Sequence, residues 1–307
     1  MVLNKVPDVD VVLHCGDLTE VCSTKGLQDS LAFLLSINAE LRLVIAGNHD
    51  TLLDHEYVHT HGEGIGSHEK AVKIINETPG VTYLREGTHE FTLMNGASFS
   101  IHASPFTPSQ YGPGYSLHAF QYASGEDRYN PVIGSNGEAI TPSYATNSSM
   151  PSSIIPPGID IIMTHGPPKY ILDRPKDDCS TGCEHLRRAD DDALLLPGPE
   201  IDGIMRNSSR RRGYARVSEQ AQKELIKGKQ ALMLNAAITG GEGRPGNAPW
   251  LVELSLPIVA TNAEKKRKYS QVDGNEPGKR HADNTTFSKV HGRLEETAFE
   301  DNVHGGL

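Results

Sequence analysis

Short apolar runs recur along the chain, and each stops at a polar residue that lies beside a glycine. Such runs, rich in Val, Ile and Leu, are typical of buried parallel strands. The runs are Asp10-Val11-Val12-Leu13-His14 before Gly16-Asp17, Leu41-Arg42-Leu43-Val44-Ile45-Ala46 before Gly47-Asn48-His49-Asp50, and Ile159-Asp160-Ile161-Ile162-Met163 before Thr164-His165-Gly166. In open α/β sheets the ligand site lies beyond the carboxyl ends of the strands. We therefore expect the three strands to bring Asp17, Asn48 and His165 to one place.

A helical pattern connects the first two runs. Ser23 or Thr24 can cap a helix, and the apolar positions that follow at the spacing of one helix face are Leu27, Leu31, Leu34 and Leu35. A strand–helix–strand crossover makes its two strands parallel. A second helix is predicted over 69–76, and Asn95-Gly96 between alternating runs predicts a hairpin whose two turn residues have positive φ. The predicted fold class is α/β, with central mixed sheets flanked by helices and the site at the strand ends.

The apolar runs divide the chain into a domain and a tail. Nearly all of them lie within 1–260, which we interpret as one domain. The stretch 125–157 is rich in Ser, Asn, Gly and Pro and has no periodicity, so we expect a mobile surface insertion. The stretch 261–307 is charged and poor in apolar residues, and we expect it to be disordered.

Composition narrows the function classes. The net charge is −10, which disfavours a general nucleic-acid binder but not a phosphate substrate. No apolar run approaches the length of a membrane span, so no membrane partner is expected. Four cysteines and the absence of an apolar leader run predict a cytoplasmic protein. The basic stretch Lys265-Lys266-Arg267-Lys268 leaves nuclear import as an alternative. The oligomeric state is not indicated.

The three strand-end residues have the chemistry of metal ligands. A carboxylate, an amide oxygen and an imidazole suit a divalent ion such as Mn, Fe or Zn. Each residue also has a plain structural reading. Asp17 can cap a turn, Asn48 can occupy a tight turn, and His165 can be a hydrogen-bonded histidine at a strand end. Their matching contexts favour a shared metal site.

The motifs Gly16-Asp17, Gly47-Asn48-His49-Asp50 and Thr164-His165-Gly166-Pro167-Pro168 together resemble the calcineurin-like metallophosphoesterase family, in its branch with His-Gly-Pro-Pro. The resemblance implies a four-layer sandwich and a site for one or two divalent ions. It implies that Asp17 bridges two metals and that Asn48 and His165 are further ligands. His49 becomes the candidate general acid, which protonates the leaving group, and Asp50 the residue that orients its ring.

Two family motifs are missing from this sequence. Members have a central strand ending in Asp-x-His, and no such segment precedes Val9. Without that strand we expect its sheet neighbours to keep unpaired backbone groups. Members also have a Gly-His-x-His motif, but no histidine lies between His185 and His281, and the stretch 194–212 holds Pro-Gly-Pro and an arginine run instead. Two alternative explanations account for these departures: a real loss of function, or an incomplete gene model.

Two functions from different classes remain. The first is a metal-dependent phosphoester hydrolase, a phosphodiesterase or phosphatase for a small-molecule ester, impaired because two ligand motifs are missing. The second is a non-catalytic phosphoesterase-like protein that binds a ligand or partner.

Overall fold

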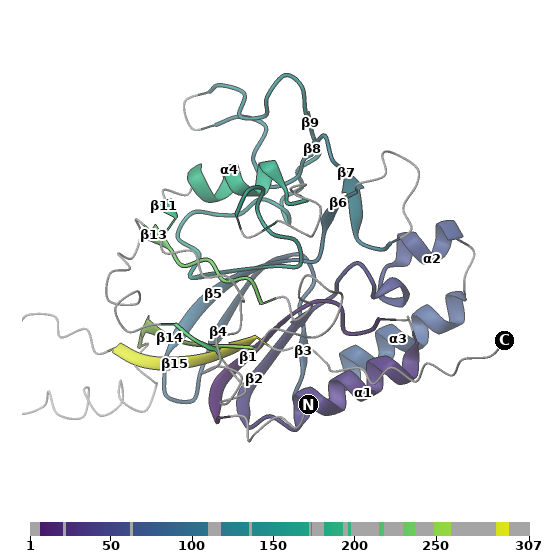
Figure 1. The fold of residues 1–307 in the computed structure, drawn as a ribbon, viewed down its shortest axis with the longest axis vertical. Coiled ribbons are helices and arrows are strands. Elements are labelled where there is room, and N and C mark those ends of the chain that lie inside the picture. The colour runs from purple at the N-terminus through teal and green to yellow at the C-terminus, as the bar shows by residue number, and fades with distance from the viewer. Residues whose placement is uncertain are drawn as a thin grey trace, which may run out of the picture.

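The computed structural model describes residues 7–20, 23–61, 64–109, 118–134, 137–171, 173, 181–192, 196–197, 215–217, 230–236, 249–258 and 287–294. Among them, the largest sheet has the strand order β12-β14-β15-β1-β2-β3, and a second sheet has the order β10-β5-β4 (Figure 1). The strands of the largest sheet are β1 (Val9–Cys15), β2 (Ala39–Ile45), β3 (Thr82–Tyr83), β12 (Ala215–Arg216), β14 (Trp250–Pro257) and β15 (Phe287–Leu294). Those of the second sheet are β4 (Gly87–Thr92), β5 (Ser98–Ser104) and β10 (Ile161–Thr164).

The first crossover follows the predicted pattern. Helix α1 (Thr24–Leu35) begins after Ser23, whose side chain accepts a hydrogen bond from the Gly26 amide at 3.0 Å. Three of the four predicted leucines are buried, whereas Leu35 is 40% exposed. Strands β1 and β2 on either side of α1 are parallel. Consequently both strands end at the same edge of the sheet.

Further helices lie beside and beyond this crossover. Helix α3 (Ile65–Glu77) contains the predicted helix 69–76 and begins earlier. Short helical segments η1 (Thr51–Leu53) and α2 (His55–His61) follow the end of β2, and α4 (Glu184–Asp192) lies late in the described chain. None of the helices in the described ranges is long and apolar enough to cross a membrane.

Apolar clusters hold the layers together. Two of them lie on opposite faces of the large sheet, because alternate residues of a strand face opposite sides. On one face of the large sheet, Val12 and Val44 pack with Leu31 of α1 and Ile75 of α3. On the other face, residues of both sheets pack together, namely Val11, Leu43, Ile45, Phe99, Ile101 and Met163. A third cluster packs Tyr122, Tyr129, Ile155 and Leu186 with partly buried Ile162 of β10. The layers are thus helices, sheet, sheet, and a cap that includes α4 (Figure 1).

The predicted hairpin is present with a different turn. Strands β4 and β5 pair antiparallel, with Thr92 opposite Ser98. The loop spans five positions, and Gly96 has a φ of 86° while Asn95 is not among the described residues with positive φ. The expectation that both turn residues have positive φ was wrong, because the longer loop requires it only at the glycine.

One part of the tail that the sequence predicts to be disordered is described as strand β15. Strand β15 lies between β1, to which it is parallel, and β14, to which it is antiparallel. Low apolar content suggested disorder, but strand pairing depends on backbone hydrogen bonds, and β1 offers a free edge for them. The expected unpaired edge beside β1 is therefore filled over Val11, Val12 and Leu13. Residues 261–286 and 295–307 lie outside the described residues.

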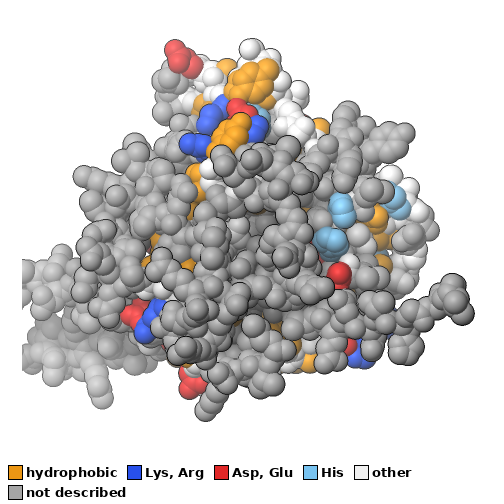
Figure 2. Space-filling model, viewed as in Figure 1, with side chains coloured by type: hydrophobic (Ala, Val, Ile, Leu, Met, Phe, Trp, Pro, Cys, Tyr) orange, Lys and Arg blue, Asp and Glu red, His pale blue; other side chains and the backbone are white. Residues whose placement is uncertain are grey.

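The stretch predicted as a mobile insertion is part of the cap. The cap segment, residues 121–157, contains β7 (Gln121–Ala123), β8 (Glu126–Asp127) and β9 (Thr146–Asn147), and β7 pairs with β6 (Thr107–Ser109). Within the cap segment, Tyr129, Asp127 and Asn130 are buried. Outside it, the short strands β11 (Leu196–Pro197) and β13 (Gln230–Ala231) pair with each other. Figure 2 shows exposed hydrophobic side chains beside Lys and Arg side chains where Figure 1 places α4.

Candidate metal centre at the strand ends

Glycines at the ends of β1 and β2 let three loops approach closely. Gly16 has a φ of 100°, and a Cβ there would lie 2.6 Å from both the Ala46 oxygen and Nδ1 of His165. A Cβ on Gly47 would collide with Asp17 Oδ1 and lie 2.6 Å from Cε1 of His165. Only glycine fits these positions without displacing a neighbour. The glycines of the two motifs are therefore required by the packing of the site.

The side chains of Asp17, Asn48 and His165 lie together, and we call them the strand-end cluster. Nε2 of His165 is 2.7 Å from Oδ1 of Asn48 and 3.4 Å from Oδ1 of Asp17. All three are partly buried, with 14% of the His165 side chain and 26% of the Asp17 side chain exposed. Asp17 has a φ of 55°, an uncommon conformation that is enriched at functional sites. The structure therefore brings together the three residues that the sequence placed at strand ends.

The other ring nitrogen of His165 determines how this cluster can bond. Nδ1 lies 2.8 Å from the carbonyl oxygen of Cys15. A carbonyl can only accept, so Nδ1 donates a hydrogen bond to it. Nε2 then faces the oxygens of Asn48 and Asp17. In the tautomer that carries its proton on Nδ1, the imidazole nitrogen, the amide oxygen and the carboxylate oxygen can together hold a cation.

Asp50 connects the two loops that carry the motifs. Its buried carboxylate accepts hydrogen bonds from the amides of Gly47 (2.8 Å), Leu18 (3.0 Å) and Thr19 (2.9 Å), and from the Thr19 hydroxyl (3.1 Å). These four bonds occupy the lone pairs of the carboxylate, and the predicted orientation of the His49 ring stays a prediction. Burial raises the pKa of Asp50 to about 6, and its hydrogen bonds oppose this rise. Asp50 fixes the loop after β1 to the loop after β2.

His49 lies beside the cluster together with a second histidine. The His49 amide donates to Oδ1 of Asp17 at 3.0 Å, which helps to hold that carboxylate. The rings of His49 and His118 have centroids 5.0 Å apart, with an interplanar angle of 57°. Burial, and then the charge of His49, lower the pKa of His118. Sequence reasoning missed His118, because it directly follows a Gly/Pro-rich stretch without periodicity.

A cavity of about 260 Å³ opens beside the strand-end cluster. The polar side chains that line it are Asn48, Thr107, His118, Gln121, His165 and Thr181. No Asp or Glu is among the described lining residues. The cavity therefore offers neutral hydrogen-bond donors next to two of the candidate ligands.

Beneath the site, His14 of β1 is fully buried, with an exposed fraction of 0%. Within the described residues, neither of its ring nitrogens has a hydrogen-bond partner. Burial lowers its pKa to about 4, so the ring is neutral at pH 7. Its place inside the strand agrees with a structural role.

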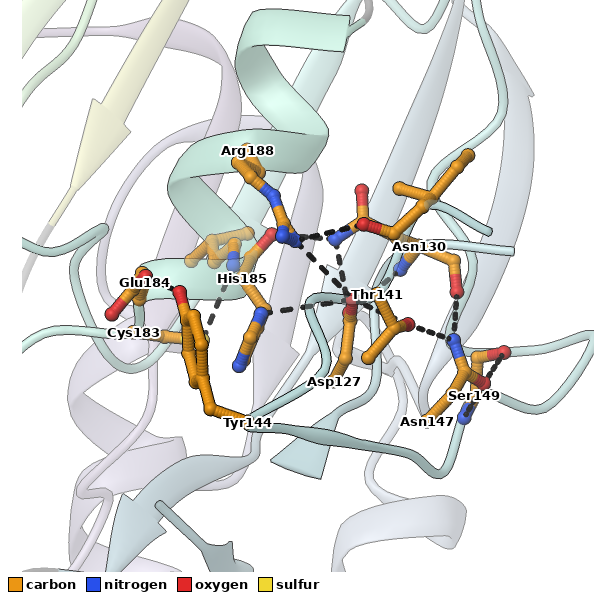
Figure 3. Close-up of polar contacts among 12 residues, drawn as sticks. Asp127, Asn130, Thr141, Tyr144, Asn147, Ser149, Cys183, Glu184, His185 and Arg188 are labelled. Atoms are coloured by element: carbon orange, nitrogen blue, oxygen red, sulfur yellow. Dashed lines mark hydrogen bonds and ion pairs between the residues drawn. The ribbon is translucent and has the colours of Figure 1, made fainter. Parts of the chain in front are cut away.

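A second group of Asp, Asn and His lies in the cap, and we call Asp127, Asn130 and His185 the cap cluster (Figure 3). Oδ1 of Asp127 accepts from the Asn130 amide at 3.2 Å and from its side-chain nitrogen at 2.9 Å. Oδ2 accepts from the Thr141 hydroxyl at 3.0 Å and lies 3.7 Å from Arg188. Nδ1 of His185 is 3.6 Å from the same oxygen. Here donors surround the carboxylate, and no cation is needed.

The described residues offer only a partial ligand set. Within them, no three His, Cys, Asp or Glu side chains are grouped to hold a metal ion, so the third donor of the strand-end cluster is an amide. Of the stretch 194–212, where the Gly-His-x-His motif was expected, only β11 is described. The donors present fit one divalent ion whose other positions are open to water or substrate.

Residues 1–206 match the family model of the calcineurin-like phosphoesterases. This is more than half of the 307-residue chain, and the chain belongs to that family. Membership implies a hydrolase that acts on ester bonds, and the family typically binds divalent metals. The mixed α/β fold with its small sheets is consistent with this assignment.

Curated relatives share part of the chain. Metallophosphoesterase domain-containing protein 1 of Homo sapiens and of Mus musculus are each 27% identical over 200 residues, covering 59% of this chain and 50% of the relative. "Probable rhamnogalacturonate lyase C" of Emericella nidulans is 30% identical over 184 residues, covering 60% of this chain and 14% of that protein. The chain thus spans half or less of the length of these relatives.

Proposed function

We propose that this chain is a metal-dependent phosphoester hydrolase whose ion is held by Asp17, Asn48 and His165. The observation that carries the proposal is the position of His165 Nε2, 2.7 Å from the Asn48 oxygen and 3.4 Å from an Asp17 oxygen. Mn, Fe and Zn each suit this donor set. When bound, such an ion withdraws charge from phosphoryl oxygens and activates water.

The chain's own residues supply the rest of the chemistry. The carbonyl oxygen of Cys15 orients the His165 ring, and the His49 amide orients Asp17. His49 is the candidate general acid, which gives a proton to the oxygen of the leaving group. Asp50 acts through the backbone, by holding the two loops in register. The substrate is a small phosphodiester or phosphomonoester.

The proposal also predicts that this chain hydrolyses its substrate more slowly than an enzyme with two ions. The described ligands suffice for one ion, and a single ion provides half of the charge clamp of a two-metal site. The rate should then be lower by orders of magnitude, because charge stabilisation is the main source of catalysis in phosphoryl transfer.

Hydrolysis of bis-p-nitrophenyl phosphate with added Mn tests the proposal. Wild type should hydrolyse the diester, while Asp17→Asn and His49→Ala should fall toward background. Asp29→Asn, on the exposed face of α1, is the matched control and should keep the wild-type rate. Equal rates in wild type and all three variants would refute the hydrolase.

The alternative is a phosphoesterase-like binding protein without turnover. It is favoured by the small ligand set of the described residues, which includes no group of three His, Cys, Asp or Glu. Calorimetric titration with Mn or Zn separates the two functions. Two-ion binding contradicts the binding protein, and the absence of ion binding contradicts the hydrolase.

A further inference from the structure

His118 is held at the wall of the cavity by bonds on its C-terminal side. The amide of Ala119 donates to the backbone oxygen of Asn48 at 2.9 Å. The Phe120 amide donates to Oδ2 of Asp54 at 2.7 Å, and its carbonyl accepts from the Thr107 amide at 2.9 Å. The residue after the histidine is therefore attached directly to the loop that carries Asn48.

Packing and strain support the same placement. Ala119 and Phe120 are 1% and 8% exposed and belong to the apolar cluster between the large sheet and the helices. Phe120 has a φ of 51°, a left-handed conformation that is strained for a residue with a side chain. Strain of this kind persists only where surrounding contacts enforce it, and it clusters at ligand sites. The strained residue lies two positions after His118.

The cavity has the chemistry of an anion site. His118 lines it together with Asn48 and His165, while the described lining residues contribute no carboxylate. Thr107 and Gln121, on the paired strands β6 and β7, add polar side chains to the same wall. Imidazole, hydroxyl and amide groups can all donate to phosphoryl oxygens.

We propose that His118 binds a phosphoryl oxygen of the substrate in this cavity, through an imidazole N–H and separately from His49. The proposal rests on the proposed function for the identity of the anion. His118 is then a substrate-binding residue, and its neighbour His49, 5.0 Å away between ring centroids, serves the leaving group. The two histidines divide binding from proton transfer.

Titration with inorganic phosphate, followed by ³¹P NMR or calorimetry, tests His118 without depending on turnover. It is carried out on the full chain with and without Mn. His118→Ala should weaken phosphate binding about tenfold or more, the effect of losing one hydrogen bond to a charged group. His118→Asn, which keeps a donor, should restore part of the affinity. His61→Ala, at an exposed position on α2, should leave it unchanged.

Kinetics provide a second readout. His118→Ala should raise KM for the diester with a small change in kcat, whereas His49→Ala should lower kcat with a small change in KM. An unchanged Mn affinity and circular dichroism spectrum would show that His118→Ala is folded with its ligands in place.

The outcomes separate this inference from the proposed function. Phosphate binding that depends on His118 in a protein without hydrolysis would refute the hydrolase and keep the inference. A wild type that does not bind phosphate, or a folded His118→Ala with wild-type phosphate affinity and KM, would overturn the inference.

Discussion

The strand-end cluster and the cap cluster contain the same residue types, Asp, Asn and His, in opposite bonding arrangements. In the cap, two donors of Asn130 and the Thr141 hydroxyl point at Asp127, and Arg188 adds a positive charge 3.7 Å away. At the strand ends, Nε2 of His165 faces an oxygen of Asn48 and an oxygen of Asp17. Residue type therefore does not distinguish a structural cluster from a ligand site. The balance of donors and acceptors does.

The difference also concerns what each cluster connects. The strand-end cluster joins the loops after the parallel strands β1 and β2 to the loop after β10 of the second sheet, and it borders a cavity. The cap cluster is buried and joins the cap segment to α4, through Asn130 and the backbone oxygen of His185 at 2.9 Å (Figure 3). We therefore expect substitutions in the first cluster to change binding and activity, and those in the second to change stability.

Asp17→Asn should give the largest effect. The change keeps the shape but removes the charge that holds a cation, and we expect the hydrolytic rate to fall about 10³-fold. The free energy of unfolding of the metal-free protein should change little. The measurements are diester hydrolysis and urea unfolding in the presence of EDTA. A large loss of stability with an unchanged rate would assign Asp17 to structure.

Asp127→Ala should give the reverse result. Removing a buried carboxylate leaves the charge of Arg188 and the donors of Asn130 without their partner, and we expect the free energy of unfolding to fall by about 3 kcal/mol. The Mn affinity of the folded protein should stay at the wild-type value. Urea unfolding and Mn titration measure the two quantities. Asp29→Ala, in an exposed ion pair with Lys25, is the control and should change stability by less than about 1 kcal/mol.

Gly47→Ala should separate the ligands of the strand-end cluster. The new Cβ would collide with Oδ1 of Asp17, so the cluster must open, and we expect the Mn affinity to fall about 10–100-fold. Gly66→Ala in α3 is the matched control, because a Cβ there meets nothing within 4 Å. Calorimetry with Mn on both variants measures the effect. Wild-type affinity in Gly47→Ala would mean that the three side chains do not share an ion.

His14→Leu should reduce the loss in free energy of unfolding that occurs as the pH falls. The folded pKa of His14 is about 4, against 6.5 for the ordinary side chain. Between these values the unfolded chain binds a proton that the folded chain does not, so stability falls as the pH falls from 6.5 toward 4. The expected loss from this residue is about 2 kcal/mol between pH 6.5 and pH 5.

Urea unfolding of the metal-free protein at both pH values measures this loss. Wild type should show it, and His14→Leu should lack it. The same pH dependence in both proteins would exclude His14 as its source.

The strand-end cluster could be predicted from the sequence because it follows from local rules. Apolar runs predict parallel strands, and parallel strands place Asp17 and Asn48 at one edge. The helix after Ser23 was predicted by the same kind of local pattern, through its cap and its leucine spacing. The ligand roles of Asp17, Asn48 and His165 stay predictions.

The features that the sequence did not indicate have a common cause, since each depends on contacts between distant residues. Asp50 bonds to Leu18 and Thr19, about thirty positions away, and this could not be read from the adjacent His49. Strand β15 is selected by the free edge of β1, although its own composition indicates disorder. The cap segment appeared structureless because its polar residues find partners such as His185, 55 positions beyond Asn130.

Titration of the metal-free wild type with Mn or Zn by calorimetry tests the central claim most directly. Three side chains of ligand type that meet at one point should bind at least one ion, and Asp17→Asn and His165→Ala should abolish that binding while Asp127→Ala keeps it. If the wild type binds no ion, the three side chains are joined by hydrogen bonds alone, and the site holds no metal.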